Sequence, residues 1–198
     1  MNNQCGSMKT GKKNFADILV KIVAVIICSI CFYMIQLEIL PNTDEMANFA
    51  RFNMIHNGRM SYQLGNIIWD ICSEISYLIF GYSYTAVRFN NTLLYSIIIL
   101  LSLNIICYYR KNMNFLSKWS FLPFYIYMVA VLANGHSVYY GVLGDGIYIY
   151  PLNNHFTPII FTLIYVNFIL YAEKNKMTAW KKYVVQICIL MYGCIWTD

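Results

Sequence analysis

Two adjacent acids stand where carboxylate chemistry is feasible. Asp44 and Glu45 follow directly on a long apolar run that ends near Pro41. A carboxylate at this point could accept a proton from an incoming hydroxyl or amine, or hold a divalent cation against a phosphate leaving group. The alternative is structural, because Thr43 or Asp44 could cap a helix N-terminus while Glu45 complements the helix dipole.

The chain around these acids is far more apolar than a soluble protein. Of its 198 residues, 59% are hydrophobic and only 12% are charged, about half the charged fraction of a soluble globular domain. The formal net charge is +5, but the lysines and arginines stand in short clusters beside apolar runs rather than along one basic face. The composition predicts a membrane protein with lipid as its partner and argues against nucleic acid.

Five apolar runs are long enough, or nearly so, to cross the hydrocarbon layer, because a helix needs about 20 residues to span roughly 30 Å. The third and fifth are short, and Lys118 and Lys182 can snorkel to lengthen them. We therefore expect an all-α, polytopic transmembrane helix bundle that forms one domain over residues 1–198. The expected spans are residues 18–40, 89–109, 119–133, 156–172 and 183–197.

Another apolar run, residues 64–81, contains two acids that argue against a crossing. Asp70 and Glu74 lie four residues apart and therefore on one helical face. Each carboxylate at the bilayer centre would be unfavourable by about 2.5–3.5 kcal/mol. We expect an amphipathic helix on the membrane surface instead. Its apolar side would consist of Ile67, Ile68, Ile71, Ile75 and Leu78.

Charge placement predicts the orientation, because cytoplasmic loops of membrane proteins are enriched in lysine and arginine. If the N-terminus is cytoplasmic and residues 64–81 do not cross the membrane, every strong basic cluster lies on the cytoplasmic side. If residues 64–81 did cross, the two later clusters would lie on the outer side. The outer loops are then residues 41–88 and 134–155, which hold all three histidines. The basic clusters are Lys9, Lys12 and Lys13; Arg110, Lys111 and Lys118; and Lys174, Lys176, Lys181 and Lys182.

This order of elements resembles the N-terminal part of the GT-C fold glycosyltransferases, which include protein O-mannosyltransferases and the lipid A aminoarabinose transferase. The shared features are a cytoplasmic N-terminus, one span, the Asp44-Glu45 pair, and a long outer loop with surface helices before the second span. In that superfamily an acid of the first outer loop is the candidate catalytic base. By this resemblance Asp44 would take the role, with Glu45 as its neighbour.

A second stretch adds to the likeness. Residues 78–83 lead through Ala86-Val87-Arg88-Phe89-Asn90 into the second span. Those transferases have a similar segment, in which a surface helix ends at a Phe-Gly turn and an arginine opens the next crossing. Gly81 would suit a helix C-cap. Arg88 at the outer interface could neutralise a lipid phosphate, and an interfacial anchor is the alternative.

The second outer loop contains Asp145, between two glycines, and His155, beside two asparagines. In several GT-C transferases an acid of this loop helps to bind metal or the phosphate of the donor. The resemblance therefore implies that Asp145 binds phosphate and, with Asp44, a divalent metal ion, the only cofactor expected. A Gly-Asp-Gly turn is the alternative for Asp145, and a polar helix start is the alternative to phosphate binding for His155.

Together these features predict a membrane glycosyltransferase at the outer face of the cytoplasmic membrane. Its donor would be a polyprenyl-phosphate-linked sugar, since soluble nucleotide sugars are made on the cytoplasmic side, and its acceptor would belong to the cell envelope. GT-C enzymes carry further spans, so we expect the sequence to be an N-terminal part of such an enzyme.

The alternative is a non-catalytic polytopic protein, such as a transporter or a flippase component of polysaccharide export. Transporters place ionisable groups within their spans. In this chain the main polar residues expected within spans are Asn104 and Gln186. That scarcity favours a site in the outer loops over a path through the membrane.

Overall fold

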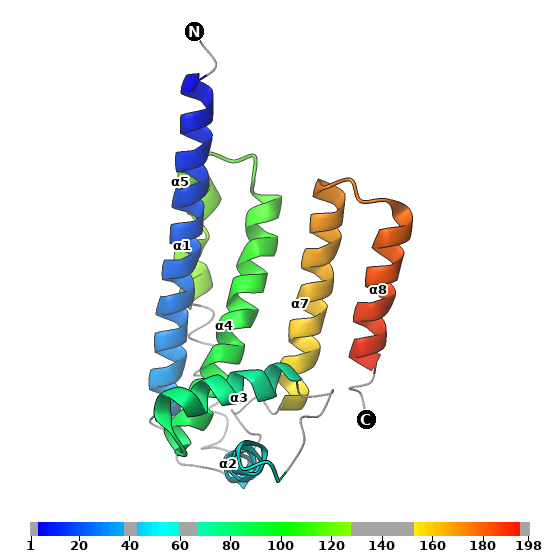
Figure 1. Cartoon of the computed structure of the whole chain (residues 1–198). Coiled ribbons are helices and arrows are strands. Elements are labelled where there is room, and N and C mark those ends of the chain that lie inside the picture. The colour runs from blue at the N-terminus through cyan, green and yellow to red at the C-terminus, as the bar shows by residue number, and fades with distance from the viewer. Residues whose placement is uncertain (1–3, 38–42, 60–66, 128–152, 195–198) are drawn as a thin grey trace, which may run out of the picture.

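The computed structural model describes residues 4–37, 43–59, 67–127 and 153–194, and all regular structure in these ranges is helical. Within them, four long helices stand side by side (Figure 1), and α4 and α7 run opposite to α1 and α8. The expected all-α fold is thus confirmed for the described ranges. The long helices are α1 (Gln4–Leu37), α4 (Tyr84–Tyr109), α7 (Asn153–Lys174) and α8 (Ala179–Cys194).

Two shorter helices, α2 (Thr43–His56) and α3 (Ile67–Phe80), lie across one end of this bundle. In Figure 1 α2 is seen end-on and α3 runs crosswise to α1 and α4. A helix on the membrane surface, as expected for residues 64–81, would run across the bundle in this way. Along α3, Ile71, Ile75 and Leu78 are exposed, whereas Trp69 and Cys72 are buried against the bundle, so the helix presents an apolar face away from its core.

By length and composition, two of the described helical segments could cross a membrane: Phe15–Met34 within α1, and Tyr84–Tyr109, which is α4. Long exposed apolar side chains along the first segment, such as Ile22, Ile26 and Ile30, agree with contact to lipid. The five-span arrangement, the cytoplasmic N-terminus and the GT-C-like fold stay predictions.

The third expected span, residues 119–133, begins differently from the prediction. A short helix α5 (Phe115–Trp119) ends in a turn at residues 120–121, and residues 122–127 are helical again. Pro123 explains the break, because proline lacks a backbone donor and fits the first turn of a helix but not its interior. Residues 128–133 lie outside the described ranges.

Polar contacts join α1 to α4 at intervals along their antiparallel interface. A core cluster of buried apolar side chains, which includes Ala24 and Leu103, packs between them. A second cluster joins both helices to α2, α3 and α7. We expected Asn104 and Gln186 to be the main polar residues of the spans. That expectation overlooked the other polar side chains inside this interface. The contacts are Lys21 Nζ to Asn104 Oδ1 at 2.6 Å, Ser29 Oγ to Ser96 Oγ at 2.6 Å, and Gln36 Nε2 to Thr92 Oγ1 at 2.9 Å.

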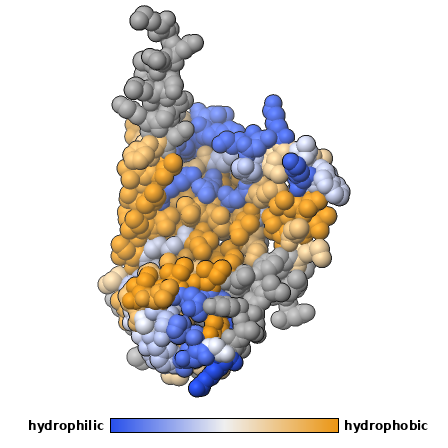
Figure 2. Space-filling view, in the orientation of Figure 1, coloured by the Kyte–Doolittle hydropathy of each residue, from blue (hydrophilic) through white to orange (hydrophobic). Residues whose placement is uncertain are grey.

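Half of the 14 lysines and arginines lie at the end of the bundle opposite α2 and α3, which we call the basic end. There α4 leads into α5, and α7 leads into α8 (Figure 1). Figure 2 shows hydrophilic residues gathered at this end and hydrophobic ones over the length of the helices below it. The opposite end, the α2–α3 end, also holds Arg51, Arg59 and Arg88. The residues of the basic end are Arg110, Lys111, Lys118, Lys174, Lys176, Lys181 and Lys182.

Gly81 stops α3 and lets the chain turn into α4. Its φ is +63°, in the left-handed region, and its N–H donates to the carbonyl of Tyr77 at 2.8 Å. The Ser83 side chain then caps α4 by accepting from the Ala86 N–H at 3.2 Å. The predicted C-cap role of Gly81 is confirmed.

Replacing Gly81 by alanine should lower the free energy of unfolding by about 1 kcal/mol, since a Cβ is unfavourable at positive φ. No neighbouring atom would meet that Cβ within 4 Å, so the loss comes from the backbone conformation alone. Gly81→Asn should lose less, because asparagine tolerates this region. Thermal unfolding in neutral detergent measures both, and an alanine variant as stable as the parent would contradict the prediction.

Candidate functional site

The sequence-predicted site residues are only partly placed by the structure. Asp44 and Glu45 lie in the first turn of α2, and His155 lies in the first turn of α7, but the side chains of all three lie outside what the structure describes. Asp145 lies outside the described residues altogether. The metal site predicted at Asp44 and Asp145 therefore stays a prediction.

Arg88 lies in the second turn of α4, inside the bundle rather than on its surface. It is 8% exposed. Its backbone carbonyl accepts from Gln36 Nε2 at 3.3 Å and from Thr92 Oγ1 at 2.9 Å, which ties the start of α4 to the end of α1. A phosphate bound by this guanidinium would be enclosed by helices at the α2–α3 end.

The best-defined polar contact at this end joins α2 to α3. Arg51 Nη2 donates to Asp70 Oδ1 at 3.0 Å, and the two side chains are 13% and 0% exposed. The guanidinium also lies 5.5 Å from the ring centre of Trp69, within cation–π range. A buried carboxylate is stable only beside a partner of opposite charge, so this pair holds α3 against α2.

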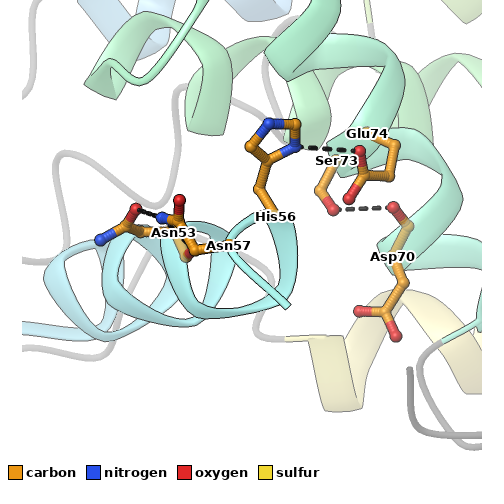
Figure 3. Close-up of polar contacts among 6 residues, drawn as sticks. All are labelled: Asn53, His56, Asn57, Asp70, Ser73 and Glu74. Atoms are coloured by element: carbon orange, nitrogen blue, oxygen red, sulfur yellow. Dashed lines mark hydrogen bonds and ion pairs between the residues drawn. The ribbon is translucent and has the colours of Figure 1, made fainter. Parts of the chain in front are cut away.

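One turn further along α3, a carboxylate meets an imidazole at the surface. His56 Nδ1 lies 3.3 Å from Glu74 Oε2 (Figure 3). The imidazole ring also stacks on Tyr77, with ring centroids 3.5 Å apart. The two side chains are 32% and 28% exposed. A carboxylate in this position orients the imidazole, and a carboxylate–imidazole pair near the surface is a common proton-transfer arrangement. The pair can therefore exchange a proton with a bound molecule.

Other groups in Figure 3 have local structural roles. Ser73 Oγ donates to the carbonyl of Asp70 at 2.7 Å, a back-bond within α3. Asn57, just after α2, donates from its side-chain amide to the Asn53 side chain in the last turns of that helix. Burial raises the pKa of the Cys72 thiol to about 11. This thiol is therefore protonated near neutral pH and is no nucleophile.

Buried amides near the start of α4 lack protein partners in the described part of the chain. Both polar atoms of the Asn90 side chain, and Nδ2 of Asn91, are buried without a hydrogen bond to any residue described. Trp69 Nε1 is in the same situation. Buried polar groups in folded proteins are nearly always hydrogen-bonded. This region therefore calls for a polar partner, which a ligand, water or another part of the chain would supply.

The sequence interpretation missed Arg51, His56 and the partner roles of Asp70 and Glu74. It treated the two acids as an obstacle to membrane crossing and gave Arg51 no role. A signal was present, because α2 carries Arg51 and His56 five residues apart, and α3 carries two acids four residues apart. Nothing in the sequence, however, states that two segments 19 residues apart face each other.

Among the described residues, no group of three histidine, cysteine, aspartate or glutamate side chains is placed to hold a metal ion. Comparison with protein-family models, with characterised proteins and with solved structures finds no match for this chain. Any functional assignment therefore rests on the residues and their geometry.

Replacing Asp70 by asparagine should lower the free energy of unfolding by about 3 kcal/mol, because Arg51 would keep its charge in a mostly buried position without the carboxylate. Glu74→Gln is the matched control on the same helix. It should change the free energy by less than about 1 kcal/mol, since its pair with His56 is partly exposed. Unfolding with sodium dodecyl sulfate in mixed micelles measures both. Equal losses in the two variants would contradict the assignment.

Proposed function

We propose that the chain is a multi-pass membrane glycosyltransferase, which takes a sugar from a polyprenyl-phosphate donor at the outer face of the cytoplasmic membrane. One observation carries the proposal. α2 and α3 lie across the same end of the bundle directly after the first long apolar helix, and acids, an imidazole and the buried Arg88 of α4 gather at this end.

Membrane placement follows from the distribution of charge. The basic end holds seven lysines and arginines at the helix connections, and cytoplasmic loops are the usual place for such residues. In the proposed orientation the N-terminus and the basic end are cytoplasmic, and the α2–α3 end is outside. The exposed apolar face of α3 then rests in the outer membrane interface.

The chemistry needs one proton acceptor and positive charge near the phosphate. A carboxylate takes the proton of the acceptor hydroxyl as its oxygen forms the new bond to the sugar C1. The bond between C1 and the phosphate oxygen breaks, and polyprenyl phosphate leaves with the electron pair. Arg88 is suited to stabilise the departing phosphate. No step of the proposal depends on a metal ion.

Two different groups at this end could serve as the base, and they cannot serve the same reaction centre. Asp44 and His56 are twelve residues apart on α2, which places their backbones about 18 Å apart along the helix. The resemblance favours Asp44, with Glu45 beside it. The contact with Glu74 favours His56 as a proton-transfer group. We propose Asp44 as the base, and the variants below distinguish the two.

The second candidate function, a transporter or flippase component, draws support from the polar contacts inside the α1–α4 interface. Lys21 with Asn104 and Ser29 with Ser96 place polar groups within helical segments that could cross a membrane. These groups bond each other across the interface, as polar residues that join transmembrane helices commonly do. We therefore favour a packing role for them and a site at the α2–α3 end.

In the full-length protein, Asp44→Asn should reduce release of polyprenyl phosphate at least about a hundredfold, the usual contribution of a general base. Native right-side-out vesicles supply the envelope acceptor, and a panel of polyprenyl-phosphate sugars labelled in the sugar supplies the donor. His56→Gln should reduce release less than Asp44→Asn does. If His56→Gln reduced the release of polyprenyl phosphate more than Asp44→Asn did, His56 and not Asp44 would be the base.

The control is Glu173→Gln, which neutralises an exposed carboxylate near the basic end of α7 and should leave turnover unchanged. Wild-type turnover by the Asp44→Asn variant would refute the role of Asp44. If the parent protein consumed none of the donors, the glycosyltransferase proposal itself would fail.

A further inference from the structure

A cavity of about 320 Å³ lies at the basic end of the bundle, far from the α2–α3 end. Side chains from α1, α4, α5 and α7 surround it, together with Lys111 from the connection after α4. None of the described residues that line it is acidic. Four of them are lysines: Lys21, Lys111, Lys118 and Lys174.

One of these lysines already has a carboxylate partner. Lys118 Nζ pairs with Asp17 Oδ2, and Trp119 Nε1 donates to Asp17 Oδ1 at 2.9 Å. The side chains of Lys118 and Asp17 are 9% and 16% exposed. This contact holds α5 against α1, and Lys118 neutralises the carboxylate of Asp17. The two joined helices form one wall of the cavity.

The other three lysines bring positive charge that neutral groups hold in place. Lys21 Nζ donates to Asn104 Oδ1 at 2.6 Å, and Lys111 Nζ lies 4.3 Å from the ring centre of Tyr108. Asn104 and Tyr108 also line the cavity. Lys174 reaches it from the last turn of α7. Three cations around one cavity repel one another, and an anion between them would relieve that repulsion.

The cavity lies near one end of the two apolar helical segments. Lys21 lies six residues inside the apolar segment that starts at Phe15, and Asn104 lies five residues before α4 ends at Tyr109. At 1.5 Å per residue these positions are about 9 and 8 Å from the helix ends. A lysine side chain at this depth can extend along its helix to reach the headgroups.

We infer that this cavity binds a phosphate group, and that the bound molecule is the headgroup of an anionic phospholipid. Phosphoryl oxygens accept hydrogen bonds from several ammonium groups at once, and basic pockets between transmembrane helices on the cytoplasmic side are suited to acidic lipid heads. The volume falls in the range of small-ligand sites, about 300–1,000 Å³. The choice of a lipid rests on the proposed membrane placement, whereas the phosphate chemistry rests on the lysines alone.

The test uses the full chain purified in neutral detergent and native mass spectrometry to count bound lipids. The probes are dioleoyl phosphatidylglycerol, dioleoyl phosphatidylcholine and inorganic phosphate. The lipid with the anionic headgroup should bind at least about tenfold more tightly than the zwitterionic one. The triple variant Lys21→Gln, Lys111→Gln, Lys174→Gln should weaken its binding by roughly a hundredfold, since each lysine near an anionic surface contributes about 1 kcal/mol.

A matched triple variant, Lys176→Gln, Lys181→Gln, Lys182→Gln, removes the same charge from the same end without touching the cavity wall. It should bind phosphatidylglycerol within about twofold of the parent. Equal losses in both triple variants, or no loss in either, would overturn the site. If the first triple variant folds poorly, the single variant Lys174→Glu, at an exposed position, tests the same loss of phosphatidylglycerol binding.

The phosphate arm separates the two sources of the ligand. Inorganic phosphate that competes with phosphatidylglycerol only at far higher concentration supports a lipid site. Phosphate that binds as tightly as the lipid, and is lost in the cavity variant alone, supports the phosphate site but overturns its assignment to lipid. None of these outcomes depends on sugar transfer, so failure here is distinguishable from failure of the proposed enzyme.

Discussion

The ion pair of Asp70 with Arg51 is the contact on which the arrangement of the helices depends. A fully buried carboxylate is stable only beside an opposite charge, and α2 supplies that charge only where α3 lies against it. Residues 67–80 are apolar enough to enter lipid, yet they form a helix across the end of the bundle (Figure 1). α4 therefore begins at the end where α1 finishes, and the two helices pack antiparallel.

That antiparallel pairing sets where the remaining polar groups lie. Polar groups on α1 meet polar groups on α4 across the interface. Lys21 Nζ and Gln36 Nε2 have partners there, whereas Gln36 Oε1 is buried without one among the described residues. The connections at the far end then carry the lysines, while Arg88 and the buried amides of α4 lie beneath α2 and α3. One bundle thus presents two polar ends of different chemistry, a basic cavity at one and a site with acids, an imidazole and a buried arginine at the other.

The sequence predicted the helical class, a helix over residues 64–81 and its stop at Gly81, because hydrophobic period, acid spacing and glycine conformation are local properties. It did not predict the pairing of His56 with Glu74 or of Arg51 with Asp70. Those contacts depend on how two separate helices meet, and periodicity carries no such information. The break at residues 120–121 was missed as well, since the apolar run continues through it and only Pro123 marks it.

The most direct test asks whether the α2–α3 end and the basic end lie on opposite sides of the membrane. Asn57 and Asn175 are exposed, each bonds within its own helix end, and each can be replaced by cysteine in a chain without other cysteines. A membrane-impermeant maleimide should label Asn57→Cys in intact cells and Asn175→Cys only after permeabilisation. Labelling of both positions from the same side, or of Asn175→Cys alone in intact cells, would contradict the account.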